Sequence, residues 1–515
     1  MTQITHALLS VYDKEGLIEL AQFLDSQNIK ILSTGGSAKA IRDANIDVTD
    51  VSEVTGFPEI FGGRVKSLHP KIHGGILARR DNEGDQKVMI EQSIAPIGLV
   101  VVNLYPFEDT LKAGGTYEEL VEKIDIGGPS MLRSAAKNHA DVTVISDPAD
   151  YQKLMGDMQQ HGGNTTCKKF RRKMAAKAFS LSASYDVAIS RWLNSELGQD
   201  LPQKLALSFE KKYDLRYGEN PHQKAAFYGA KNGELGLGDA LQIQGKELSY
   251  NNINDGDAAL SMVAEFSEPA CIVVKHANPC GGAVADNIET AWQNALKGDP
   301  VSAFGGIVAF NREVTATVAR QMVEIFLEVI IAPKFSDEAK EVLAAKKNLR
   351  LLEFTQMDAL KESYTYRSVK GGLLVQAQDN ELFDGEPQCV TKRKPTNSEL
   401  KDLNFAWVIC KYVKSNAILF VKNQMIIGTG AGQMSRVDAT LNAIRKAKEV
   451  GNDIAGAVVA SDAFYPFPDG LIAAAEAGVK AVVQPGGSIK DEDVIKAADE
   501  HDIAMLLTSM RHFRH

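Results

Sequence analysis

The dipeptide Lys275-His276 has the residue types and the position that acid-base chemistry needs. It follows the apolar stretch CIVV (271–274) and precedes the glycine-containing segment ANPCGG (277–282). Side chains at the carboxyl end of a strand can share one reacting centre, and a histidine with a pKa of about 6.5 can take or give a proton there. Taken alone, the pattern also fits a histidine with a purely structural role.

A basic loop in the first part of the chain has the composition to close on an anion. The segment GGRVKSLHPKIHGG (62–75) places five basic or titratable side chains between two pairs of glycines. Glycines give the backbone the freedom to fold around a ligand. The alternative is a solvent-facing loop, which has no need of four flanking glycines.

Three further turns follow expected strands and contain groups that suit a phosphate or a carbonyl oxygen. Gly35-Gly36 precedes a helix, whose N-terminus attracts anions. NLYP (103–106) closes another strand with two polar groups, and its proline ends the ladder. In IDIGGPS (124–130), a Gly-Gly pair opens a helix that has a proline near its first position. Each turn also fits a plain tight turn or a capped helix.

The elements that must position these groups follow from hydrophobic periodicity. Residues 1–146 alternate strand-like and helix-like patterns, which indicates a parallel α/β sheet. We expect four strands in it, at 7–11, 29–32, 99–102 and 142–145. Asp13 is expected to cap the first helix, whose apolar face is formed by Leu17, Leu20, Ala21 and Leu24. Ligands in such sheets bind at the carboxyl ends of the strands, so the candidate groups gather at one edge.

The rest of the chain has a different organisation. Residues 147–201 predict polar helices that connect two domains, and the basic run KKFRRK (168–173) fits a solvated helix face. From residue 202 the α/β alternation resumes and runs twice. Strand 271–274, a turn and a helix at 288–297 match strand 425–427, a turn and a helix at 438–448. We expect an internal duplication, with halves at about 202–365 and 366–515, whose second copy lacks a Lys-His pair.

Composition limits the classes of function. With 57 Lys and Arg against 66 Asp and Glu, the net charge of −9 disfavours a general nucleic-acid binder. The N-terminal sequence does not have the pattern of a signal peptide, and no apolar run is long enough to span a membrane. Five widely spaced cysteines without a C-x-x-C pair predict neither a disulfide framework nor a zinc site. We expect a cytoplasmic protein with reduced thiols.

Segments along nearly the whole chain resemble one family, in order. TGFPEIFGGRVKSLHPKIHGGILARR, VVNLYPFE and IDIGGPSMLRSAAKNHADV are similar to the IMP cyclohydrolase domain of the bifunctional AICAR transformylase/IMP cyclohydrolase family. RYGENPHQ, KELSYNNINDGDAAL, VVKHANPCGG, DPVSAFGG, KSNAI, GAGQMSR, SDAFYPFPDG, QPGGSI and MRHFRH resemble its transformylase domain. The resemblance implies an α/β fold, with a methylglyoxal-synthase-like, Rossmann-type domain at 1–146. A helical connection at 147–201 and two cytidine-deaminase-like halves at 202–515 would follow.

For the first domain, the resemblance implies a nucleotide site and a ring closure in which a carboxamide nitrogen attacks a formyl carbon and water leaves. The residues expected around the nucleotide are Ser10, Lys14, Ser33, Thr34, Arg64, Lys66, Ser67, Asn103, Asp125 and Gly127. Tyr12 stands where the family has a small hydroxyl residue, although a tyrosyl OH can reach a phosphate from further back. Lys66 and Tyr105 are expected to stabilise the formyl oxygen. Asp125 and Lys137 are expected to orient the carboxamide and to move protons.

For the last domain, the resemblance implies formyl transfer from 10-formyltetrahydrofolate to AICAR, an aminoimidazole carboxamide ribotide. His276 would act as general base on the weakly basic amine, and Lys275 would stabilise the oxyanion or protonate the departing folate nitrogen. The expected binding residues are Arg216 and Arg511 at the phosphate or carboxamide, Asn416 at the formyl oxygen, Phe464, Pro466 and Phe467 against the pterin, and Glu328 as a pterin-binding acid. Tyr217 is also expected to bind substrate. The resemblance also implies a homodimer and a potassium ion near Ser415 and Asp462.

Two other classes of function stay open as alternatives. A zinc deaminase of the same fold needs H-x-E together with P-C-x-x-C, but Ala283 takes the place of the second cysteine after Pro279-Cys280. A nucleotide-sensing regulatory protein needs groups that bind phosphate but not groups that transfer protons, such as Lys275-His276. We therefore expect an enzyme without a transition metal that makes formyl-AICAR and closes it to IMP.

Overall fold

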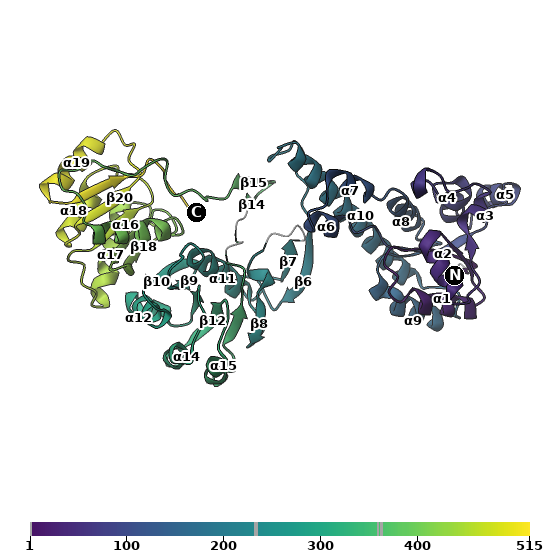
Figure 1. Ribbon diagram of the computed structural model, residues 1–515, viewed down its shortest axis with the longest axis horizontal. Coiled ribbons are helices and arrows are strands. Elements are labelled where there is room, and N and C mark those ends of the chain that lie inside the picture. Colours follow the sequence, from purple (N-terminus) through teal and green to yellow (C-terminus); the bar gives the residue numbers. More distant parts are fainter. Residues whose placement is uncertain (1–2, 231–234, 358–359, 361–363) are drawn as a thin grey trace. The chain divides into compact units, whose positions relative to one another are not determined.

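A five-stranded parallel sheet forms the centre of the N-terminal part of this computed structural model, which describes residues 3–230, 235–357, 360 and 364–515. The chain divides into one unit made of residues 3–209 and 230, and a second made of 210–229 and 235–515 (Figure 1). Each unit has its own sheet and its own hydrophobic core. The two units are described separately below.

The sheet of the first unit confirms the expected strands. Its order is β3-β2-β1-β4-β5 and all neighbours are parallel. The strands are β1 (His6–Ser10), β2 (Lys30–Ser33), β3 (Thr49–Asp50), β4 (Ile97–Val102) and β5 (Thr143–Ile145). All six residues of β4 are buried, as expected for a central strand with helices on both faces. The carboxyl ends of β1, β2 and β4 therefore open at the same edge.

Most helices of the first unit pack on this sheet. The helices are α1 (Leu17–Ser26), α2 (Gly35–Asp43), α3 (Val51–Thr55), α4 (Pro70–Leu77), α5 (Glu83–Glu91), α6 (Phe107–Lys112), α7 (Tyr117–Glu122), α8 (Gly127–Lys137), α9 (Tyr151–Gln160) and α10 (Lys168–Glu196), with short 3-10 turns η1 (Phe61–Gly63) and η2 (Pro148–Asp150). Helices α6 and α7 instead pack against α10 in a separate small cluster. The apolar face expected for α1 is confirmed, but its cap is not Asp13. Gly16, at φ 66°, is the N-cap, because the Asp13 carboxylate instead accepts the N–H of Glu15 at 2.9 Å and forms a turn before the helix.

Helices α9 and α10, in the segment expected to connect two domains, contribute to the core of the first unit. Leu154 of α9 and Met174 of α10 are buried in the same cluster as the residues of β1 and β4. The basic run 168–173 is exposed as expected at four of its five cations. Arg171 is the exception: it is 6% exposed and donates to the carbonyls of His139, Ala140 and Thr166.

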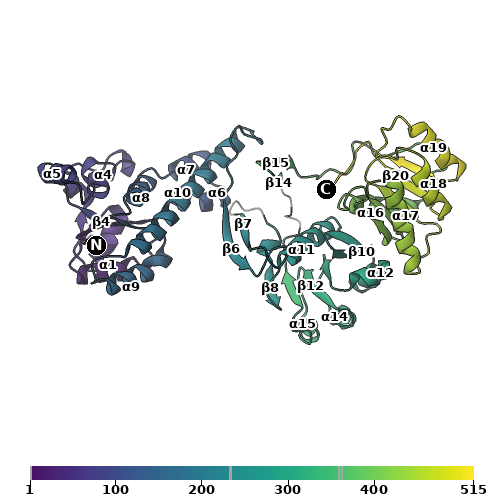
Figure 2. The same cartoon turned by 180° about the vertical axis from the view of Figure 1, so that it is seen from behind.

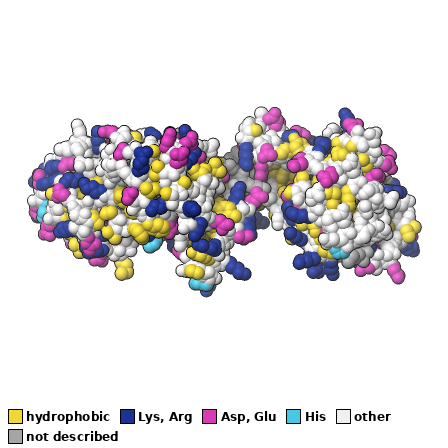
Figure 3. All heavy atoms as spheres, turned by 90° about the horizontal axis from the view of Figure 1, so that it is seen from below, with side chains coloured by type: hydrophobic (Ala, Val, Ile, Leu, Met, Phe, Trp, Pro, Cys, Tyr) yellow, Lys and Arg dark blue, Asp and Glu magenta, His cyan; other side chains and the backbone are white. Residues whose placement is uncertain are grey.

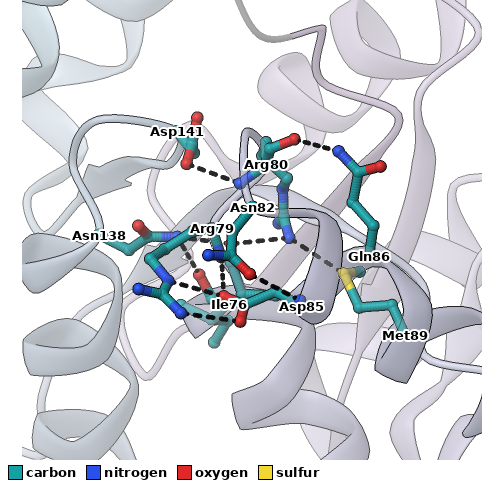
Figure 4. A network of polar contacts seen from close by, with 10 residues as sticks. Ile76, Arg79, Arg80, Asn82, Asp85, Gln86, Met89, Asn138 and Asp141 are labelled. Atoms are coloured by element: carbon teal, nitrogen blue, oxygen red, sulfur yellow. Dashed lines mark hydrogen bonds and ion pairs between the residues drawn. The ribbon is translucent and has the colours of Figure 1, made fainter.

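The segment 62–75, expected to be a loop, is helical from Pro70 onward, because His69 caps α4 and Pro70 suits its first position. An arginine-centred network holds the end of this helix (Figure 4). The guanidinium of Arg80 donates to the carbonyls of Gly75 at 2.6 Å and Ile97 at 3.2 Å, and its backbone N–H donates to Asp141 at 3.1 Å. Burial lowers the pKa of Arg80, and the nearby Asp141 partly opposes that effect. The contacts join α4 to the start of β4 and to the loop after α8. The basic loop therefore leads into a fixed helix.

A twelve-stranded mixed sheet spans the second unit. Its order is β16-β21-β20-β19-β17-β18-β10-β9-β11-β12-β13-β8. The strands are β8 (Leu241–Gln244), β9 (Ala270–Lys275), β10 (Asn278–Val284), β11 (Gly306–Phe310), β12 (Leu327–Ala332), β13 (Arg350–Glu353), β16 (Gln388–Cys389), β17 (Ile418–Lys422), β18 (Met425–Gly430), β19 (Val458–Ser461), β20 (Ala481–Gln484) and β21 (Ala504–Leu507). The two halves meet where β10 pairs with β18. Two short ribbons, β6 (Phe209–Leu215) with β7 (Ala225–Ala230) and β14 (Tyr364–Val369) with β15 (Gly372–Ala377), lie outside this sheet.

Helices cover both faces of the second sheet. On one face, α11 (Tyr250–Val263) and α16 (Asn397–Cys410) share a single core. On the other face lie α12 (Ile288–Gly298), α13 (Pro300–Ala303), α14 (Ala316–Met322), α15 (Asp337–Leu343), α17 (Arg436–Glu449), α18 (Asp469–Glu476) and α19 (Asp491–Glu500). Figure 2 gives the reverse view of these layers. Alternate residues of β9 face the two cores: Ile272 and Val274 face one, Cys271 and Val273 the other.

The duplication is present, but its alignment differs from the one expected. The structure matches β9 with β17 and β10 with β18, and each pair is a hairpin, whereas 271–274 was expected to match 425–427. The glycines that suggested a turn lie inside strands. A Cβ at Gly281 would be 2.1 Å from the carbonyl of Ala295, and one at Gly428 would be 2.6 Å from that of Ala443, so these glycines let a helix approach. The counterpart of Lys275-His276 is therefore Lys422-Asn423.

In the part of the chain that the structure describes, no helix is long and apolar enough to cross a membrane.

Two candidate active sites

A cavity of about 720 Å³ lies at the carboxyl ends of β1, β2 and β4 in the first unit. It contains most of the residues expected around the nucleotide and in ring closure. Those in its lining are Ser10, Tyr12, Lys14, Thr34, Arg64, Lys66, Ser67, Asn103, Tyr105, Asp125 and Gly127. The basic loop, the NLYP turn and the Gly-Gly helix start thus meet in one place.

The floor of this cavity is held by short polar contacts between strand ends. The side-chain oxygen of Asn103 accepts the backbone N–H of Tyr12 at 2.6 Å and that of Asp13 at 3.2 Å. The hydroxyls of Ser10 and Thr34 lie 3.0 Å apart. The ring of Tyr12 packs edge-on against Tyr105, with 5.7 Å between centroids. Tyr12 therefore supports a residue that was expected to act in catalysis.

The N-terminus of α2 is flanked by two ammonium groups. A Cβ at Gly36 would lie 3.7 Å from Nζ of Lys14, and one at Gly35 would lie 3.9 Å from Nζ of Lys66. Thr34, the N-cap, makes no side-chain capping bond. A helix N-terminus with two nearby cations favours a phosphate group.

Asp125 is the most perturbed acid in the cavity. Burial raises its pKa, and the N–H of Gly128, which donates to it at 2.8 Å, opposes that effect only in part. Tyr185 of α10 fixes the backbone here, because its hydroxyl accepts the N–H of Asp125 at 2.9 Å and donates to the carbonyl of Lys123 at 2.7 Å. A carboxyl group with a raised pKa next to Lys66 is suited to proton transfer.

Two expected residues do not line this cavity. Ser33 is fully buried, and its hydroxyl donates to the carbonyl of Leu9 at 2.6 Å. Lys137 is exposed at the last residue of α8, ten residues after Gly127, which is roughly 15 Å along a helix. Sequence reasoning missed Glu122, which lines the cavity and forms an ion pair with Arg64. A surface-type glutamate on a helix gives no sequence signal for such a position.

The second candidate site is built around the hairpin between β9 and β10. Lys275 Nζ donates to the carbonyls of Phe304 and Gly305, both at 2.9 Å. The side chain of His276 is exposed, and its backbone has a φ of 52°. Both residues line a cavity of about 340 Å³ that also includes Thr429 and Lys446 from the other half. The acid-base pair thus faces a cavity formed by the two halves.

Helix α11 links this hairpin to Glu328. Asn252 donates to the Glu328 carboxylate at 2.7 Å, and Asp255, one turn later on α11, accepts the N–H of His276 at 3.1 Å.

Glu328 lies 3.9 Å from Arg350. Burial lowers the pKa of Arg350; Glu328 opposes this effect, and the charge of the nearby Arg216 adds to it. Arg216 in turn stacks 5.0 Å from the ring of Tyr217. Arg350 thus lies near both Glu328 and Arg216.

Asn278 connects the hairpin to the loop that carries Ser415 and Asn416. It donates to the carbonyl of His276 at 3.0 Å and accepts the N–H of Lys414 at 3.0 Å. Arg436 then bridges Asn416, at 2.8 Å, to Asp462, at 2.6 Å. Sequence reasoning missed Arg436 although it noted the GAGQMSR motif, because a buried arginine, here 7% exposed, cannot be distinguished from a surface one by sequence.

The last residues of the chain pack against the same loop. The N–H of Ser415 donates to the carbonyl of Arg514 at 2.9 Å, and Lys414 Nζ donates to the carbonyl of His515 at 2.8 Å. His512 is 1% exposed and pairs with Asp379. Arg511 is exposed and lies over the ring of Phe513. The last residues of the chain are therefore packed against this loop.

The remaining predicted residues of this site are Phe464, Pro466 and Phe467, which are exposed on the loop after β19. They follow Asp462, whose two carboxylate oxygens contact Arg436 and Ser415. Among the described residues, no three His, Cys, Asp or Glu side chains are grouped to hold a metal ion. Burial raises the pKa of Cys280 to about 12, so this thiol is protonated in the structure as described.

These features define an α/β protein with two candidate active sites: a cavity lined by cations and by a carboxyl group of raised pKa in one unit, and a Lys-His pair beside a cavity in the other. The family model described as AICARFT/IMPCHase bienzyme matches residues 135–446, and the MGS-like domain matches 16–130. The bifunctional purine biosynthesis protein PurH of Rhodospirillum rubrum is 54% identical over 99% of both chains. That of Bradyrhizobium diazoefficiens is 52% identical over 100% of this chain and 99% of its own. The crystal structure of ForH covers 36% of this chain and 97% of its own, with 35% identity and a TM-score of 0.32.

The chain belongs to the AICARFT/IMPCHase bienzyme family. The expected fold class, with a methylglyoxal-synthase-like first domain followed by transformylase α/β halves, is confirmed.

Proposed function

We propose that this enzyme transfers a formyl group from 10-formyltetrahydrofolate to AICAR and then closes the product, formyl-AICAR, to IMP. The match with bifunctional relatives over the whole length carries this conclusion. Two separate cavities with different acid-base groups support it. The folate is a co-substrate that leaves as tetrahydrofolate.

Formyl transfer is proposed to use His276 and Lys275. The imidazole takes a proton from the AICAR amine as the amine attacks the formyl carbon, which overcomes the weak basicity of that amine. Lys275 already donates to two carbonyls, so one of its three N–H groups is left for the developing oxyanion or for the folate nitrogen. The carbon–nitrogen bond to the folate then breaks, and the folate nitrogen receives a proton.

The other groups around the hairpin are proposed to bind the substrates. Arg216, Tyr217 and Arg511 surround the phosphate or carboxamide of AICAR, and Asn416 holds the formyl oxygen. The pterin contacts form a second set, made up of Glu328, Phe464, Pro466 and Phe467. The link from α11 to Glu328, and that from Asn278 to the loop carrying Asn416, support the assignment of these two residues; the others rest on the resemblance to the family.

Ring closure is proposed to occur in the cavity of the first unit. The N-terminus of α2, with Lys14 and Thr34, holds the phosphate. Lys66 and Tyr105 stabilise the formyl oxygen while the carboxamide nitrogen attacks, and water leaves from the resulting carbinolamine. Asp125 accepts the carboxamide proton, and its raised pKa suits that task. A role for Lys137 stays a prediction, because it lies outside the cavity lining.

The resemblance to the family carries two finer proposals. One is a homodimer, which sedimentation of the purified protein tests. The other is a potassium ion near Ser415 and Asp462. Replacing potassium by sodium in the assay should lower formyl transfer if the ion binds there, and should leave ring closure unchanged.

The direct test supplies AICAR and 10-formyltetrahydrofolate and follows both formyl-AICAR and IMP. We expect stoichiometric conversion to IMP, with tetrahydrofolate released in equal amount. A nucleotide-sensing protein would bind AICAR but form neither product. Zinc analysis of the same preparation tests the deaminase alternative, because a zinc deaminase would contain stoichiometric zinc.

A further inference from the structure

The turn that presents His276 has an unfavourable backbone for its residues. His276 and Ala277 both have positive φ angles, 52° and 57°, as in the two-residue hairpin turns that favour Asn-Gly. Side chains with a Cβ are strained in this region. The turn therefore needs support from outside the hairpin.

The carboxylate of Asp255 supplies that support. It is 8% exposed on α11 and accepts the N–H of His276 at 3.1 Å and that of Ala277 at 2.9 Å, one with each oxygen. A carboxylate that accepts two backbone N–H groups makes strong, directional bonds. Asn252, one turn earlier on α11, holds Glu328. One helix thus fixes both the proposed base and the proposed pterin-binding acid.

The second half of the unit contains the same arrangement without the histidine. Asp402 of α16, 6% exposed, accepts the N–H of Asn423 at 2.9 Å and that of Gln424 at 2.6 Å. Those two residues have φ angles of 53° and 51°. Lys422, the counterpart of Lys275, pairs with Asp453 at 2.8 Å. The carboxylate-held turn is therefore a property of the duplicated fold, and only the first copy carries an acid-base pair.

We infer that Asp255 is a positioning residue for formyl transfer, which sets the location of the His276 imidazole by holding the turn in its left-handed conformation. This inference rests on the proposed role of His276. Asp255 contacts neither substrate nor proton in this account, and acts only through the backbone of the turn. A shift of about 1 Å in a reacting group costs roughly 10²-fold in rate.

The duplicated turn offers a matched control. Asp255→Asn and Asp402→Asn remove the same acceptor from equivalent buried positions, so both should lower Tm to a similar extent. We expect Asp255→Asn to lower kcat for formyl transfer by about 10²-fold while KM for AICAR changes little. Asp402→Asn should keep wild-type kcat, and ring closure should be unchanged in both. Wild-type kcat in Asp255→Asn, or an equal loss in Asp402→Asn, would overturn the inference.

A second variant separates positioning from stability and from proton transfer. Glycine adopts positive φ without strain, so Ala277→Gly in the Asp255→Asn background should restore most of kcat. The pH profile of kcat should keep the wild-type acid limb, because His276 stays the base. If the acid limb of the kcat profile shifted and Ala277→Gly did not restore kcat, the Asp255 carboxylate itself would take part in the chemistry. That result would contradict the inference. Formyl transfer that survives His276→Ala would instead refute the proposed role of His276.

Discussion

Single residues in this enzyme acquire their chemistry from burial and from their immediate partners. Asp125 and Asp255 are both carboxylates that accept backbone N–H groups. Asp125 lines a cavity and burial raises its pKa, a combination that suits a group exchanging protons with a substrate. The two oxygens of Asp255 accept two backbone N–H groups of one turn, so its proposed role is to hold that turn. The same residue type thus serves two purposes.

The raised pKa of Asp125 predicts the pH dependence of ring closure. Asp125 must be ionised to accept a proton, and its folded pKa lies above the usual value of about 3.9. The kcat/KM for formyl-AICAR should therefore fall as pH drops through a limb above the ordinary aspartate range. Asp125→Asn should lower the rate by about 10²- to 10⁴-fold and abolish this limb. If Asp125→Asn kept an acidic limb at the same pH as the wild type, that limb would belong to another group.

Tyr12 should affect ring closure through its ring. Tyr12→Ser introduces the small hydroxyl residue expected here and removes the edge-on contact with Tyr105. Loss of an aromatic pair of this kind should lower kcat/KM for ring closure by about 2- to 10-fold. Tyr12→Phe keeps the ring and should be close to wild type. Equal losses in both variants would mean that the hydroxyl matters, and not the packing.

At the scale of helices and strands, periodicity was enough to predict the first sheet, but it could not predict how the second sheet repeats. The strands of the first unit alternate with amphipathic helices, so each is visible in sequence. Gly281 and Gly428 instead suggested turns, because sequence cannot show that a helix carbonyl approaches them. The true turns, His276-Ala277 and Asn423-Gln424, contain no glycine. The carboxylates that allow them are about 21 residues away in sequence, at Asp255 and Asp402.

Helix α10 should support ring closure through Tyr185, although it lies outside the expected first domain. Its hydroxyl joins the N–H of Asp125 to the carbonyl of Lys123. Tyr185→Phe leaves the N–H of Asp125 without this acceptor, so we expect roughly a tenfold lower kcat for ring closure. Formyl transfer, measured on the same preparation, should not change. Unaltered ring closure would limit α10 to a packing role.

The C-terminal segment should contribute binding through Arg511. Because this side chain is exposed, Arg511→Ala should leave Tm unchanged. Loss of a charged hydrogen bond should raise KM for AICAR in formyl transfer by about 10- to 100-fold. Arg320→Ala, an exposed arginine on α14, serves as the control. An unchanged KM in Arg511→Ala would remove Arg511 from the site.

At the scale of the whole molecule, the chain consists of two units with separate cores. The described lining residues of the two cavities are all different. On the face drawn in Figure 3, side chains of both charges are interspersed with hydrophobic ones. We therefore expect the binding of anionic substrates to depend on local groups such as Lys14 and Lys66, within a chain of net charge −9.

The most direct test of two independent sites compares Lys66→Ala with His276→Ala in separate assays of each reaction. We predict that His276→Ala loses formyl transfer but closes supplied formyl-AICAR at the wild-type rate. Lys66→Ala should form formyl-AICAR at the wild-type rate but fail to close it. If either substitution abolished both reactions in a folded protein, the assignment of one reaction to each unit would be contradicted.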